Sequence, residues 1–64
     1  MFATHTIETY NLDTIVGEFV WSVFDTRPNG AEAFRLARAL KADGEVSRIV
    51  TSTGFVLRTF VPGK

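Results

Sequence analysis

The chain has 64 residues, of which 45% are hydrophobic and 22% are charged, and this composition is typical of a globular domain rather than a disordered segment. Seven basic and seven acidic residues give a formal net charge of zero, which excludes a strongly basic nucleic-acid arm and an acidic mimic of DNA. Because cysteine is absent, the chain has no disulfide, no thiol nucleophile and no cysteine-based zinc site. We expect a single domain over residues 1–64, and no motif in it identifies a function.

The small size of the domain limits its core. A single core of this size supplies only ~3–5 kcal/mol, so small domains usually add disulfides, a metal or a second subunit. Since the chain has no cysteine and one histidine, we expect a homodimer. No window reaches the ~18 apolar residues of a membrane span, and the first residues lack the positive charge of a secretory signal. We therefore expect a cytoplasmic protein that has no membrane partner.

The first half of the chain predicts two strands. Residues 4–10 form a polar strand, which we place at an edge of the sheet, and residues 11–14 follow as a turn or a short helical turn. Residues 18–25 are apolar on both faces, a pattern typical of a strand that is covered on two sides. We interpret Trp21 as a core residue under the helix, with an interface hot spot as the alternative.

Residues 31–42 predict the one helix. Asn29 is a good N-cap, Glu32 stands where a capping-box partner belongs, and Gly44 suits the left-handed position after the last turn. Residues at helical spacing form an apolar stripe that we assign to the core. They are Ala33, Phe34, Leu36, Ala37 and Leu40.

The last two strands are predicted at residues 46–51 and 55–61. The three residues between them, 52–54, form a hairpin loop with Gly54 in the left-handed position. The element order is therefore ββαββ, and the connection through the helix is long enough for a crossover between parallel strands. We predict an α+β fold, a small ββαββ domain with a four-stranded sheet and one helix packed on one face.

The sequence offers no catalytic constellation. His5 is the only histidine, and none of the serines has an obvious general base beside it. The glycines form neither a dinucleotide-binding nor a Walker pattern, and metal ligands at a recognisable spacing are missing. We therefore predict no catalytic residue, no metal, no cofactor and no enzymatic activity.

A candidate binding site follows from the predicted hairpin register. A three-residue loop pairs Val50 with Val56, Arg48 with Arg58, and Val46 with Phe60, all on the face away from the helix. Two arginines side by side repel each other unless an acidic group lies against them. This acidic group could come from the second strand, from a second subunit or from a target. A two-residue loop would instead place the two arginines on opposite faces. The predicted partner-binding residues are Arg48, Arg58, Phe60, Val50 and Val56.

Charge is divided unevenly along the chain. Residues 1–26 contain four acidic residues and no lysine or arginine, whereas residues 27–64 contain seven basic and three acidic residues. The two halves neutralise each other within a fold or across a dimer, or the second half presents a basic face to an acidic partner. We expect a non-enzymatic interaction protein of regulatory, inhibitor or adaptor type, acting through a sheet face as a homodimer and toward an acidic protein surface. The alternative is a nucleic-acid-binding protein that uses Arg48, Arg58, Phe60 and the helix arginines.

Overall fold

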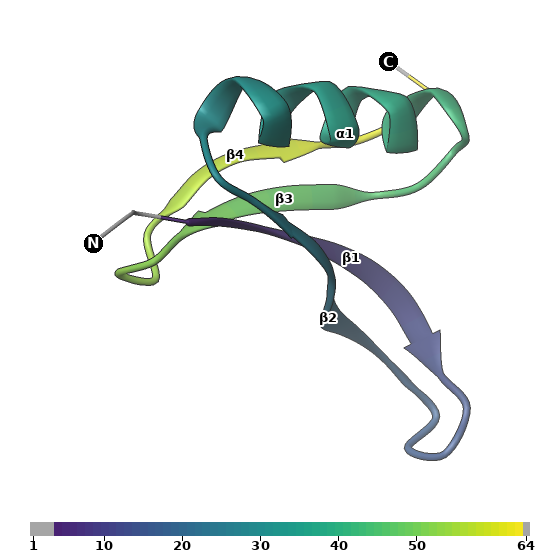
Figure 1. Ribbon diagram of the computed structural model, residues 1–64. Coiled ribbons are helices and arrows are strands. Elements are labelled where there is room, and N and C mark those ends of the chain that lie inside the picture. The colour runs from purple at the N-terminus through teal and green to yellow at the C-terminus, as the bar shows by residue number, and fades with distance from the viewer. Residues whose placement is uncertain (1–3, 64) are drawn as a thin grey trace.

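The computed structural model describes residues 4–63. The elements in chain order are β1 (His5–Asp13), β2 (Glu18–Arg27), α1 (Gly30–Ala42), β3 (Ser47–Thr51) and β4 (Val56–Phe60) (Figure 1). The strands form one sheet in the order β2-β1-β3-β4, and all neighbouring strands are antiparallel. The predicted α+β fold is confirmed, because in the described range a single helix accompanies this four-stranded sheet in the ββαββ order.

Strand β1 lies inside the sheet, so its predicted position at an edge is wrong. It pairs with β2 on one side and with β3 on the other. Its polar side chains find partners locally, since Asn11 Nδ2 donates to Thr9 Oγ1 at 2.8 Å and Thr9 is buried. β2 and β3 therefore run parallel to each other with β1 between them, and β2 and β4 are the two edge strands.

The turn between β1 and β2 occupies residues 14–17, three residues later than predicted. The carboxylate of Asp13 accepts the backbone N–H groups of Ile15 and Val16 at 2.9 and 3.2 Å. The N–H of Gly17 donates to the carbonyl oxygen of Asp13 at 2.7 Å. An aspartate that accepts these bonds initiates a turn, so the chain stays extended through Asp13.

The predicted helix and both of its ends are confirmed. Asn29 Oδ1 accepts the N–H of Glu32 at 2.9 Å, and the helix begins at the next residue, Gly30. At the other end Gly44 adopts a φ of +87°, which favours glycine over residues with a side chain. The Gly44 N–H bonds to the Lys41 carbonyl, and the N–H that follows bonds to the Leu40 carbonyl, which is the Schellman arrangement.

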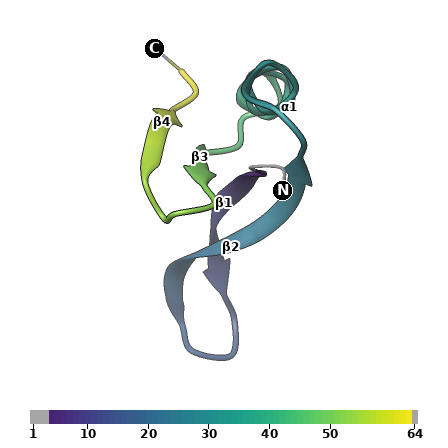
Figure 2. The same ribbon diagram turned by 60° about the vertical axis from the view of Figure 1, so that its left-hand side comes forward.

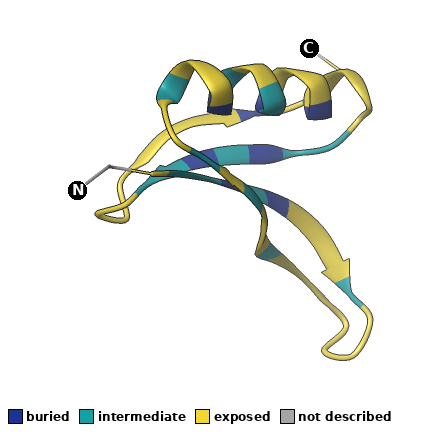
Figure 3. Ribbon diagram, viewed as in Figure 1, coloured by how far each residue is buried: buried dark blue, intermediate teal, exposed yellow. Residues whose placement is uncertain are grey.

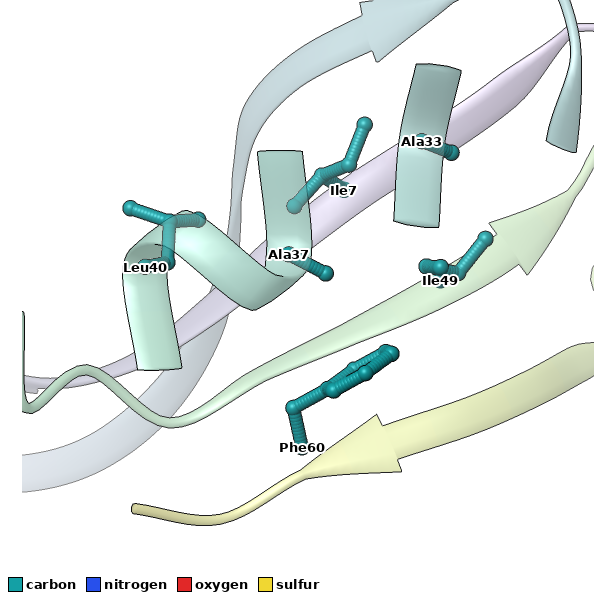
Figure 4. Packing of buried hydrophobic residues seen from close by; sticks show 6 residues of the cluster. All are labelled: Ile7, Ala33, Ala37, Leu40, Ile49 and Phe60. Atoms are coloured by element: carbon teal, nitrogen blue, oxygen red, sulfur yellow. The ribbon is translucent and has the colours of Figure 1, made fainter. Parts of the chain in front are cut away.

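The hydrophobic core lies between α1 and the sheet, and it is small (Figure 4). Two alanines at the centre of the helix face let its backbone approach the sheet closely, and Phe34 packs its ring edge-on against Phe60 at a centroid distance of 5.6 Å. The predicted core positions Ala33, Ala37 and Leu40 are buried. The buried hydrophobic residues are Ile7, Ala33, Ala37, Leu40, Ile49 and Phe60.

The hairpin of β1 and β2 extends beyond the helix as an arm, which we define as residues 10–23 (Figures 1 and 2). The residues of this arm are mostly exposed (Figure 3), so the prediction that the second strand is covered on both sides is wrong. The arm elongates the molecule, whose extents are 38 × 26 × 15 Å and whose radius of gyration is 11.9 Å. A compact chain of this length has a radius of about 10.7 Å.

Candidate functional site: the open sheet face

The sheet has one face that the helix does not cover, here called the open face. In β1 and β3 the side chains of Ile7 and Ile49 point toward α1 and are fully buried. Because side chains alternate along a strand and directly paired residues share a face, the register assigns the neighbouring residues to the open face. Its principal members are Glu8, Tyr10, Leu12, Phe19, Trp21, Val23, Arg48, Val50 and Val56.

Three aromatic rings form a row on the open face. Tyr10 and Trp21 are directly paired across β1 and β2, with ring centroids 4.9 Å apart. Tyr10 also stacks on Phe19, with a centroid distance of 5.5 Å and an interplanar angle of 23°. The row is open to solvent, since 57% of Phe19 and 65% of the nearby Val23 are exposed. The exposure of three neighbouring aromatic rings to water is unfavourable in free energy.

Arg48 lies at the end of the aromatic row and forms an ion pair with Glu8. Its Nε lies 2.6 Å from Glu8 Oε1 on the neighbouring strand, and its guanidinium carbon lies 4.2 Å from the centre of the Trp21 ring. An acidic group therefore does lie against Arg48, but it comes from β1, which was not among the predicted sources (the second strand, a second subunit or a target). The ion pair and the cation–π contact together fix Arg48 against the sheet.

The predicted pairing of Arg48 with Arg58 is wrong, although the loop that suggested it is correct. The N–H of Thr51 donates to the Phe55 carbonyl at 2.8 Å, and Gly54 has a φ of +89°, as a three-residue loop requires. The predicted pairing of Val50 with Val56 is confirmed. A β-bulge then inserts one extra residue into β4, so Arg48 lies opposite Thr59.

The bulge moves two predicted site residues to the helix side of the sheet. Arg58 lies opposite Ile49, with its guanidinium carbon 5.9 Å from the Phe34 ring and 5.4 Å from the Phe60 ring. Phe60 lies opposite Ser47 instead of Val46, and it belongs to the core with 7% of its surface exposed. Of the five predicted partner-binding residues, the open face therefore unites only Arg48, Val50 and Val56.

Trp21, predicted under the helix, lies instead on the open face, where Arg48 and Tyr10 half-bury it. Tyr10 and Phe19 were not among the predicted site residues. The alternation of Phe19, Trp21 and Val23 was a visible signal for one shared face. It did not reveal which face the helix covers, because that depends on how the crossover packs.

Within residues 4–63, no three His, Cys, Asp or Glu side chains are grouped so that they could hold a metal ion. The pKa of Asp25 is lowered from its ordinary value of 3.8, chiefly by the backbone N–H of Thr26 and further by the Arg27 guanidinium. This pair lies where β2 meets the helix, away from the aromatic row.

In the part of the chain that the structure describes, no helix has the length and apolar character needed to cross a membrane.

No protein-family model matches the chain, and neither a curated protein sequence nor a solved structure shows significant similarity to it.

Proposed function

We propose that this chain is a small, non-enzymatic interaction protein of regulatory, inhibitor or adaptor type, which acts through its open sheet face and works as a homodimer. The observation that carries the proposal is the row of Trp21, Tyr10 and Phe19 on a face that no element of the described chain covers. Tryptophan, tyrosine and arginine are the residues that most often dominate binding energy at protein interfaces. The absence of cysteine suits a cytoplasmic site of action.

The numbers of buried and exposed hydrophobic residues support association with a second copy. Among residues 4–63, six hydrophobic residues are buried and twelve large hydrophobic residues are exposed. A monomer of this size has little stability to spare, and an apolar surface of this kind marks an interface. The open face is also nearly neutral, since Glu8 matches Arg48, so no large net charge on it opposes an apolar contact.

The oligomeric state tests the proposal. We expect sedimentation equilibrium at micromolar concentration to give twice the chain mass of 7.1 kDa. Trp21 is the only tryptophan, so its emission reports on the open face alone and should shift to the red as dilution exposes the ring. A single species of 7.1 kDa at high concentration, with an emission maximum that dilution leaves unchanged, would contradict the proposal.

A surface substitution tests whether the open face takes part in forming the dimer. Val23→Lys places a charge opposite Glu8 on the open face, at a position that is 65% exposed, and should weaken the dimer at least about tenfold. The matched control is Thr53→Lys, which adds the same charge at the exposed hairpin loop and should leave the dimer unchanged. Equal effects of the two variants would show that the open face is not involved.

Nucleic-acid binding is the second candidate, and the stacked aromatic row is what favours it, because bases stack on such rings. It is weakened by Glu8, which neutralises Arg48, and by the separation of Arg58 and Phe60 from the open face. Titration with an oligothymidine distinguishes the two candidates. Quenching of Trp21 that falls steeply with salt would favour nucleic acid, and no quenching at low salt would exclude it.

A further inference from the structure

We infer that two copies of this chain join along their β2 strands, antiparallel and around a two-fold axis at Ser22, so that the two sheets become one. The inference rests on the proposed homodimer and specifies its geometry. The joined sheet would place the aromatic rows of both copies on a single continuous open face. It would also bring the tip of each arm onto the helix of the other copy.

The two edge strands of the sheet are not equally suited to this role. β2 is ten residues long and exposed over most of its length, whereas β4 has five residues. The middle residue of β4 is Arg58, so antiparallel pairing of two β4 strands about their centres would bring two arginines together. The middle of β2 carries Trp21, Ser22 and Val23, which bear no charge.

The bulge in β2 helps to set the register of a self-paired edge. The pairing of β1 with β2 slips by one residue at Phe24, because Ile7 lies opposite Asp25 and Glu8 opposite Val23. With the axis at Ser22, Trp21 lies opposite the partner's Val23 on the open face. Because the two-fold axis places one bulge on each side of itself, skipping Phe24 once on each side keeps the outer residues of the two strands paired on matching faces.

The charges at the two ends of β2 fit the same register. It pairs Glu18, at the start of the strand, with the partner's Arg27, at the end, and the two-fold axis makes this pair twice. Arg27 donates through one terminal nitrogen to Asp25, and its remaining donors can take a second carboxylate. β2 thus carries an acid at one end and a base at the other, as antiparallel self-pairing requires.

The tip of the arm has a matching site on the partner. Ile15 at the tip is 94% exposed and Val16 is 61% exposed. In the proposed register this tip continues past the partner's Arg27 toward the start of its helix. Beside Arg27 and along one side of that helix lies a hollow of about 210 Å³, lined by Arg27, Glu32, Arg35, Leu36 and Ala39. A water molecule occupies about 30 Å³, so the hollow has room for an aliphatic side chain.

The cysteine-free chain allows a direct test by cross-linking. Residues paired across antiparallel strands have Cα atoms about 4.5–5.5 Å apart, which is within the range of a disulfide. Ser22→Cys should therefore oxidise to a covalent dimer at micromolar concentration at least about tenfold faster than Thr59→Cys, which is the matched control on the other edge strand. If Ser22→Cys cross-links no faster than Thr59→Cys, the inference is overturned.

Charge reversal gives an independent test. Glu18→Arg and Arg27→Glu should each weaken the dimer about tenfold, and an equal mixture of the two variants should restore it, because each mixed pair regains opposite charges. Arg38→Glu is the control and should have no effect, because Arg38 is exposed and lies one helical turn after Phe34, which packs on Phe60 of β4. Since Arg27→Glu also removes the ion pair with Asp25, its thermal melt is recorded alongside. Failure of the mixture to associate more tightly than the folded single variants would contradict the register.

These tests separate the two levels of the proposal. A wild-type chain that stays monomeric would reject the homodimer and the β2 geometry together. A wild-type dimer that does not cross-link through Ser22→Cys would leave the proposed function standing and remove only the β2 geometry.

Discussion

The helix-covered part of the sheet and the arm are made of the same kinds of residue in opposite surroundings. Under the helix, Ile7 and Ile49 are fully buried between two layers. On the arm, Ile15, Phe19 and Val23 are between 57% and 94% exposed. Burial here is decided by where α1 lies and not by side-chain character, since the helix spans only part of the sheet (Figure 3).

This difference predicts that the covered part and the arm differ in their local free energy of unfolding. The covered part is held by its own packing, whereas a two-stranded hairpin that projects alone is marginally stable in water. The arm should therefore open locally at a lower free energy than the covered part. A second copy is the simplest source of the missing contacts.

The largest expected effect is in the covered part. Ile49→Ala removes a fully buried side chain from the centre of the small core, and it should cost about 2–5 kcal/mol of the free energy of unfolding. Because the domain has little more than that in total, the variant should lose its cooperative melt. Ile15→Ala, at the exposed tip of the arm, is the matched control and should leave the melt of the monomer unchanged. Similar melts for the two variants would show that the covered part is not the core.

A smaller effect is expected where the two parts meet on the open face. Glu8→Gln removes the charge that holds Arg48 against Trp21, and it should cost about 1 kcal/mol. The Trp21 emission should change with it, because the guanidinium loses its fixed place over the ring. A double-mutant cycle with Arg48→Gln measures the coupling, and zero coupling would mean that the pair contributes nothing.

One substitution in the covered part should stabilise the protein. The hydroxyl of Ser47 is fully buried and has no hydrogen-bond partner among the described residues. Ser47→Ala removes this unpaired group and should raise the free energy of unfolding by up to about 1 kcal/mol. Urea denaturation measures the change. A loss of stability would indicate that the hydroxyl has a partner in solution.

The smallest expected effect is a dependence on pH at the end of β2. The folded pKa of Asp25 lies below its ordinary value of 3.8, so its contribution to stability is present above pH 3.8 and is lost as the pH falls through the folded pKa. Carboxyl NMR titration should report the lowered pKa. In Arg27→Gln the pKa should stay lowered in part, because the N–H of Thr26 is the larger cause. A return to the ordinary value would assign the whole shift to Arg27.

The sequence predicted the local structure well and the long-range arrangement less well. Asn29 and Gly44 marked both ends of the helix, and Gly54 marked the hairpin loop, because each acts on its immediate neighbours. The bulge in β4 carries no comparable signal, yet it decided whether Arg58 joins Arg48 or the core. The position of Trp21 was missed for a similar reason, since local pattern does not tell which strands the helix covers.

Residue-resolved hydrogen exchange at several protein concentrations tests most directly the claim that a second copy completes the arm along β2. In the dilute monomer, the amides of residues 18–27 that point away from β1 should exchange much faster than those of β3. As concentration rises, these β2 amides should become protected in proportion to the dimer formed, while the β3 amides stay unchanged. Exchange in β2 that is the same at all concentrations would contradict the account.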